Sequence, residues 1–125
     1  MRRLASGLAV AAIVALSACD SGPRGPGTIT AFAAGPSVAG VVLEVQGAGI
    51  QSFTARGSSR VYSAAVEGPA ATHRVVIITP DPGEMVVDIA VDDLGMEDPA
   101  IRVVSAANGA NEAIARSNVT VRLER

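Results

Sequence analysis

The stretch EMVVDIAVD, Glu84 to Asp92, decides the fold class of this chain. Every second residue in it is a large apolar one, and the residues between them are mixed in character. An alternation with period two places one set of side chains on a single face of an extended strand. That apolar face consists of Met85, Val87, Ile89 and Val91. The stretch is therefore predicted to be a β-strand with one buried face.

The C-terminal stretch NVTVRLER, residues 118–125, repeats the same alternation. It predicts an inward face of Val119, Val121 and Leu123 and an outward face of Thr120, Arg122 and Glu124. Between these two stretches and before them, short apolar runs are separated by Gly, Pro, Asn and Asp at intervals of about ten residues, a spacing typical of a β-sandwich or barrel. The runs are Thr28–Ala34, Gly40–Gln46, Ile50–Ala55, Arg60–Val66, Thr72–Thr79 and Ala100–Ala106. We therefore predict an all-β domain over residues 28–125, a single sandwich of about eight strands.

Two segments of this domain depart from simple alternation. Val75 to Ile78 is apolar at four consecutive positions, which predicts a strand whose outer face is also covered. Residues 111–117, NEAIARS, allow a short helical turn before the last strand.

The N-terminus has a different character from the rest of the chain. Arg2 and Arg3 are followed by an uncharged apolar run, Leu4 to Ala18, in the order that an export signal requires. At about fifteen residues this run is shorter than the roughly twenty that cross a membrane. Residues 1–18 are therefore predicted to be a signal peptide.

The run ends in Leu16-Ser17-Ala18-Cys19, which contains the only cysteine of the chain. This tetrapeptide resembles the lipobox of bacterial lipoproteins. The resemblance implies that Cys19 is lipidated, by a diacylglycerol on its sulfur, and that the signal is cleaved before it. Two or three acyl chains, at about 0.8 kcal/mol per buried CH₂, hold a protein firmly on a membrane. The expected localisation is thus an exported protein anchored to the cell envelope by lipid.

Residues 19–27 are predicted to be a tether because Gly and Pro at this density disfavour regular structure. Asp20 is similar to the residue that retains lipoproteins in the inner membrane of enteric bacteria, but the choice between inner and outer membrane stays open. Without the signal, the chain keeps eight of its ten basic residues, all arginine, against twelve acids, and has a formal charge of −4. A mildly acidic chain with no basic stripe argues against a nucleic-acid partner.

From Gly40 to Glu124, the order VVLEVQGAGIQSF, RVYSAAV, HRVVIITPDPGEMVVDIAVDD and DPAIRVVSAANGANEAIARSNVTVRL resembles the layout of cohesin-like domains. Many immunoglobulin-like sandwiches share this pattern. The cohesin-like resemblance implies a nine-stranded, jelly-roll-like sandwich that attaches one protein to another.

Enzymatic chemistry is not expected from these residues. His73 is the only histidine, no nucleophile elbow of the GxSxG type is present, and lipidation removes the only thiol. The aromatic side chains, Phe32, Phe53 and Tyr62, are too few to line a sugar site, and we assign them to the core or the sheet surface.

One cluster of charge could bind a metal. The stretch DIAVDDLGMEDP supplies Asp88, Asp92, Asp93, Glu97 and Asp98, and crowded carboxylates are the ligands that Ca²⁺ prefers. Solvated turns at strand ends have the same composition, so both readings stay open. The calcium candidates are Asp92, Asp93, Glu97 and Asp98.

Together these features predict a non-catalytic, lipid-anchored sandwich that binds another envelope protein, with no cofactor. The alternative is a surface lipoprotein that binds calcium or a small ligand.

Overall fold

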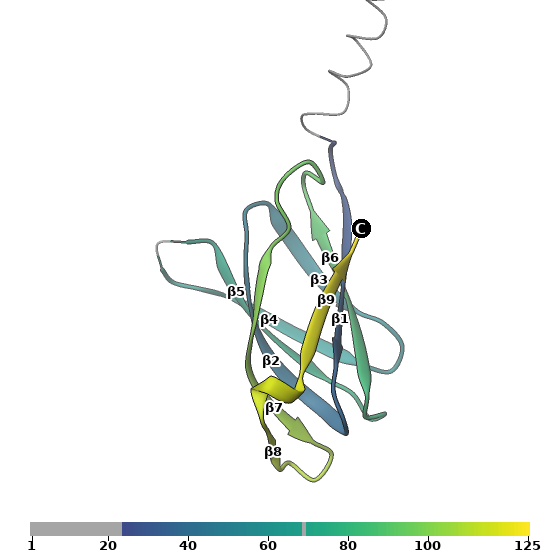
Figure 1. Ribbon diagram of the computed structural model, residues 1–125. Coiled ribbons are helices and arrows are strands. Elements are labelled where there is room, and N and C mark those ends of the chain that lie inside the picture. Colours follow the sequence, from purple (N-terminus) through teal and green to yellow (C-terminus); the bar gives the residue numbers. More distant parts are fainter. Residues whose placement is uncertain (1–23, 69) are drawn as a thin grey trace, which may run out of the picture.

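The computed structural model describes residues 24–68 and 70–125, which form two antiparallel β-sheets packed face to face (Figure 1). Sheet A has four strands in the order β3-β6-β1-β9, and sheet B has five in the order β4-β5-β2-β7-β8. The strands are β1 Gly27–Ala34, β2 Val38–Gln46, β3 Ile50–Ala55, β4 Arg60–Val66, β5 Thr72–Ile78, β6 Glu84–Val91, β7 Ala100–Asn108, β8 Ala113–Ile114 and β9 Thr120–Glu124. The all-β sandwich predicted from the sequence is confirmed.

Most connections cross from one sheet to the other. Only β4–β5 and β7–β8 join neighbouring strands of the same sheet. As a result β1, the first strand, lies between β6 and β9, and sheet A is complete only when the last strand of the chain is in place.

The core forms between the sheets from the alternating faces that the sequence predicts. Met85, Val87, Ile89 and Val91 of β6 are all buried, and each is at most 7% exposed. They meet the buried valine, leucine and isoleucine side chains of β2 and β5 across the sandwich. Fully burying one such side chain stabilises the fold by about 1.5–3 kcal/mol relative to leaving it exposed. The predicted inward face of β9 is also confirmed, with Val119 buried and Val121 and Leu123 packed against the core.

Two local expectations differ from the structure. Residues 111–117 form no helix; instead, β8 pairs with β7, and a 3₁₀ turn follows at Arg116–Asn118. The outer face of β5 is not covered by another layer, because Ile78 is 51% exposed. The apolar run Val75–Ile78 therefore lies in a strand with one buried and one open apolar face.

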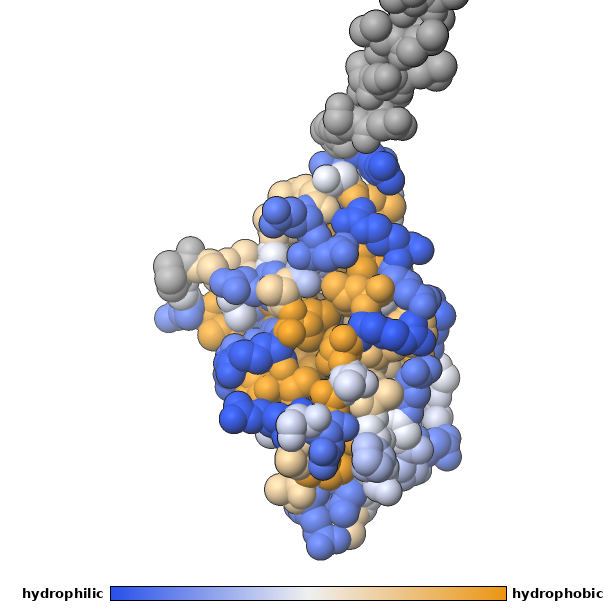
Figure 2. Space-filling view, in the orientation of Figure 1, coloured by the Kyte–Doolittle hydropathy of each residue, from blue (hydrophilic) through white to orange (hydrophobic). Residues whose placement is uncertain are grey.

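The two long sides of the sandwich are not equally closed. On one side β3 and β4 approach each other across the sheets, whereas β7 and β9 make no comparable approach within the described residues. Figure 2 shows apolar surface in the middle of the side where β7 and β9 face the viewer. The apolar side chains of these strands are half-buried against the core: Ile101, Val103, Val121 and Leu123. We therefore assign this surface to the margin of the core.

Candidate functional site

The most exposed apolar side chains lie on the outer face of sheet B. Tyr62 on β4 is 57% exposed, and Ile78 on the neighbouring β5 is 51% exposed. Strand register places Tyr62 directly beside Val76, and Val76 beside Val42 of β2. Tyr62, Val76 and Val42 form an apolar row that crosses β4, β5 and β2 at right angles to the strands. Large contiguous apolar patches on protein surfaces are often contact sites for another molecule.

A shallow groove continues this row toward β7. Gly40 lies between Ile78 of β5 and Ala107 of β7, and it contributes no side chain. A hollow of about 180 Å³ is lined by Gly40, Val42, Val76, Ser105 and Ala107, among others. A second hollow of about 380 Å³ shares Gly40 and Ala107 and extends to the turns after β5 and β7. The face thus combines exposed side chains with a depression that can receive side chains from a partner.

A charged row borders the apolar row along the same face. Glu44 of β2 lies between Arg74 of β5 and Arg102 of β7 and forms an ion pair with each. The hydrogen bonds from Arg102 and then Arg74 hold the pKa of the Glu44 carboxyl below its usual range. Since both guanidinium groups bind Glu44, neither is available to cover the apolar row. We call the apolar row, the groove and this charged row the docking face.

On the outer face of sheet A, charged and polar side chains cover the surface and bind one another. Its aromatic residue, Phe32, lies beneath the guanidinium of Arg122, which is 3.8 Å from the ring centroid. On the next row, Asp88 accepts hydrogen bonds of 2.8 Å from Arg56 and of 2.9 Å from the Thr30 hydroxyl. The bond from Arg56 is the main reason that the pKa of Asp88 lies below its usual range. Sheet A therefore presents a hydrogen-bonded polar surface to solvent.

The predicted calcium residues lie in the loop between β6 and β7, which the structure organises through backbone groups. The Asp93 carboxylate accepts hydrogen bonds from the amides of Gly95 at 2.8 Å, Arg24 at 2.8 Å and Gly25 at 3.3 Å. These bonds, the one from Gly95 first, hold the pKa of Asp93 below its usual range. Asp93 thereby attaches residues 24–25, the end of the predicted tether, to the sandwich.

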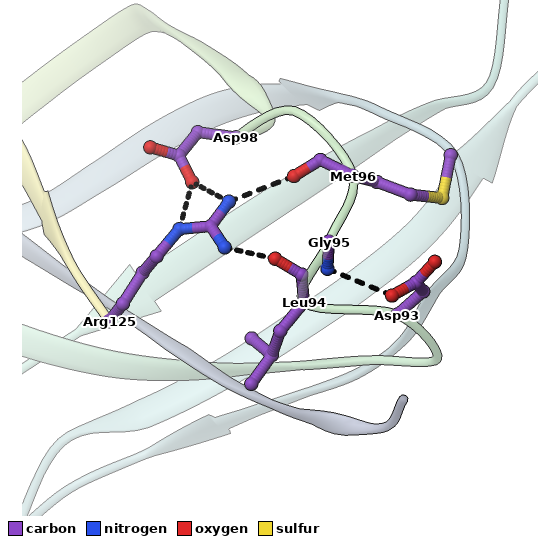
Figure 3. Close-up of polar contacts among 6 residues, drawn as sticks. All are labelled: Asp93, Leu94, Gly95, Met96, Asp98 and Arg125. Atoms are coloured by element: carbon purple, nitrogen blue, oxygen red, sulfur yellow. Dashed lines mark hydrogen bonds and ion pairs between the residues drawn. The ribbon is translucent and has the colours of Figure 1, made fainter. Parts of the chain in front are cut away.

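The other side of this loop surrounds an arginine (Figure 3). Arg125 binds Asp98 through Nε at 2.9 Å and Nη2 at 2.7 Å, and it also donates to the carbonyl oxygens of Leu94 and Met96. Three oxygens of the loop thus face one guanidinium, a positive charge that belongs to the chain itself. The Asp92 amide donates to the Gly49 carbonyl at 2.9 Å, whereas the carboxylates of Asp92 and Glu97 form no hydrogen bond or ion pair within the described residues. Calcium binding by Asp92, Asp93, Glu97 and Asp98 stays a prediction.

The remaining residues singled out in the sequence have separate positions. Cys19 and the signal peptide lie outside the described residues. His73 on β5 points into the sandwich, where its ring packs edge-on against Phe53 with 5.5 Å between the centroids. Within residues 24–68 and 70–125, no three His, Cys, Asp or Glu side chains come together in a group that could hold a metal ion. The helices of the described chain include none long and apolar enough to cross a membrane.

Comparison with known proteins adds no relative: no protein family, curated protein or solved structure significantly matches this chain. The site must therefore be argued from its own geometry. Sequence reasoning missed the docking face because its residues come from four separate strands. The signal in the sequence was the apolar run Val75–Ile78, which is apolar on both faces. We interpreted its outer face as covered by another part of the protein.

Proposed function

We propose that this protein is an exported lipoprotein, anchored through Cys19, whose sandwich binds another protein of the cell envelope through the docking face. The role is non-catalytic and requires neither a cofactor nor nucleic acid. The observation that carries the docking proposal is the apolar row of Tyr62, Val76 and Val42 on the outer face of sheet B, beside the groove. Protein contacts take most of their binding energy from a few side chains, among which tyrosine is over-represented.

The anchor is supported by the lipobox Leu16-Ser17-Ala18-Cys19 and by the position of residues 24–25. Because Asp93 holds these residues, the β6–β7 loop is the part of the sandwich nearest to the proposed anchor. The docking face runs along the side of the sandwich, with its charged row nearer to this end and its groove farther from it. A lipid anchor in this arrangement leaves the face accessible to a neighbour on the same membrane.

The anchor is tested by Cys19→Ala in the full chain, with Ser21→Ala as the matched control. We expect Cys19→Ala to move the protein out of the detergent phase or to leave an uncut precursor, while Ser21→Ala partitions like the wild type. A Cys19→Ala protein that is processed and still partitions with the membrane contradicts lipidation.

The docking proposal is tested by co-purification from membranes with Ile78→Ser, using Met96→Ser as the matched control. Both residues are exposed hydrophobics, 51% and 41% respectively, but only Ile78 lies on the docking face. We expect Ile78→Ser to retain at least about fivefold less of a co-purifying protein, and Met96→Ser to retain the wild-type amount. Equal loss in the two variants contradicts the assignment of the face.

A further inference from the structure

Strand β4 is an edge strand without the features that normally block edge-to-edge pairing. Natural sheets protect their edges with charges, prolines, bulges or very short strands. The other edge strands conform to this rule: β3 has a bulge near Gln51, β8 has two residues, and β9 carries Arg122 and Glu124. In contrast, β4 has seven residues, pairs with β5 without a register shift, and contains no charge or proline from Val61 to Val66.

The second half of β4 is open on both faces as well as along its edge. Ser63 and Ala65 point toward the inner side, since they pair with Val75 and His73, yet both are exposed. Tyr62, Ala64 and Val66 are exposed on the outer side. Figure 1 shows the β4–β5 hairpin projecting from the body of the sandwich. A row of backbone groups is therefore free to pair with an added strand.

The ends of β4 carry opposite charges. Arg60 begins the strand, and Glu67 follows its last residue. Both are exposed, and neither forms an ion pair with the described part of the chain. Two copies of β4 laid antiparallel bring the end of each that begins with Arg60 near the end of the other that is followed by Glu67. A parallel arrangement brings like charges together, which is unfavourable.

We propose that the occupant of this edge is a second copy of the chain, paired antiparallel through β4 about a twofold axis at Ser63. In the combined sheet, the hydrophobic cores of both copies must lie on the same side. Inward-facing residues of one β4 must therefore lie opposite inward-facing residues of the other, so the register can change only by two residues at a time. Pairing that uses all seven residues places Ser63 opposite the partner's Ser63 and Arg60 one residue from the partner's Glu67. The two five-stranded sheets then form one continuous sheet, and the two docking faces become neighbours.

A pair of single strands is a small interface, well below the roughly 1,200–2,000 Å² of stable complexes. The dimer is therefore expected to be weak in dilute solution and to form where the local concentration is high. The proposal does not depend on the docking partner, because the dimer pairs the backbone edge of β4, whereas the partner contacts the outer face of the sheet, to which β4 contributes Tyr62.

The first test is oxidative cross-linking of Ser63→Cys in the full chain, in membranes. Directly opposite Cα atoms in antiparallel strands lie about 4.5–5.5 Å apart, which is within the range that a disulfide spans. Ser52→Cys is the matched control, since Ser52 is an exposed serine on the edge strand of sheet A. The wild type measures any contribution from Cys19. We expect a disulfide-linked dimer for Ser63→Cys in at least about fivefold excess over both controls.

The second test is a charge reversal at the ends of the strand, with dimer formation as the readout. Arg60→Glu or Glu67→Arg alone should reduce the Ser63→Cys dimer about fivefold, because each brings like charges to the same end of the strand pair. The double variant Arg60→Glu/Glu67→Arg should restore it, since the ends are again complementary. These variants change exposed groups, so the fold is expected to be preserved.

Two results overturn the proposal. One is a Ser63→Cys dimer no more abundant than the Ser52→Cys dimer, or a cross-link to a different protein in its place. The other is a double charge reversal that dimerises no better than the single variants. If no dimer forms but a partner still co-purifies in a way that depends on Ile78, only this inference is refuted. If the dimer forms but no partner co-purifies, only the docking proposal is refuted.

Discussion

Each outer face of the sandwich carries an aromatic residue, Phe32 on sheet A and Tyr62 on sheet B, and the two residues differ in how far other side chains cover them. On sheet A, Arg122 lies over Phe32 at 3.8 Å from the ring centroid. On sheet B, Tyr62 is 57% exposed, and the guanidinium of Arg74 on the neighbouring strand β5 is bound to Glu44. The ring on sheet A is thus covered by an arginine of the neighbouring strand, whereas the ring on sheet B is left open.

This difference is the basis of the separate roles that we propose for the two sheets. Hydrogen bonds among Thr30, Arg56 and Asp88 give sheet A a surface that is complete by itself. Sheet B leaves apolar area exposed, and that area gains free energy when another molecule covers it. Changes to the outer face of sheet A should therefore affect folding alone, whereas changes to the outer face of sheet B should also affect binding.

The largest effect is expected from a matched pair of substitutions, Val42→Gln and Val86→Gln. Both valines are half-buried and face outward from a strand inside their sheet, Val42 on sheet B and Val86 on sheet A. We expect Val42→Gln to lower partner capture at least about tenfold and Val86→Gln to leave it within about twofold. Both should lower the free energy of unfolding similarly, by about 0.5–1.5 kcal/mol, as measured by urea titration. Equal losses of capture would remove the distinction between the faces.

Asp88→Asn should weaken sheet A without affecting capture. Loss of the charged hydrogen bonds from Arg56 should lower the free energy of unfolding near neutral pH by about 1 kcal/mol. Because the pKa of Asp88 is lowered in the folded state, its contribution is present above about pH 4 and is lost as the pH falls through the lowered value. Urea titrations at pH 6 and pH 3 should therefore show a smaller pH effect for Asp88→Asn than for the wild type. An unchanged pH effect argues against this carboxylate as a source of acid sensitivity.

Arg122→Ala should expose the aromatic residue on the outer face of sheet A, as Tyr62 is exposed on sheet B. Removing the guanidinium exposes Phe32, so we expect higher fluorescence of a hydrophobic dye and a loss of about 0.5–1 kcal/mol in unfolding free energy. Arg116→Ala, an exposed arginine in the 3₁₀ turn, is the control and should change neither quantity. Equal dye binding by Arg122→Ala and the wild type would show that the arginine does not cover the ring.

The smallest effect on folding is expected from Tyr62→Ser. Its side chain is already 57% exposed, so the free energy of unfolding should change by less than about 0.5 kcal/mol. Dye binding should fall, in contrast to its rise in Arg122→Ala. A substantial loss of stability would show that Tyr62 belongs to the folded framework and not to an open face.

The sequence predicts the strands well because burial on one face imposes a period-two pattern. The stretches 84–92 and 118–125 show it, and their inward residues are those that the structure buries or packs against the core. It does not predict β8, because two residues that pair along an edge produce no pattern. It also does not predict the contact between Arg125 and the β6–β7 loop, since that contact joins segments about thirty residues apart in the sequence.

The docking face was beyond prediction for a different physical reason. Apolar residues on both sides of a strand indicate that both sides avoid water, but not whether the second side is covered by the same chain or by another molecule. Val75–Ile78 therefore suggested a covering layer, and the structure instead leaves Ile78 half exposed. Only the register of β4, β5, β2 and β7 brings Tyr62, Val76, Val42 and Gly40 onto one surface.

The most direct test of the docking face is photo-cross-linking of the full chain in its membranes from two outward strand positions. A photoreactive residue is needed because the chain contains no lysine for amine-reactive reagents. Ser105 lines the groove on sheet B, and Thr120 lies on the outer face of sheet A. We predict one dominant protein adduct from Ser105 and none from Thr120. Adducts of equal yield from both positions, or from Thr120 alone, would contradict the assignment of sheet B as the binding surface.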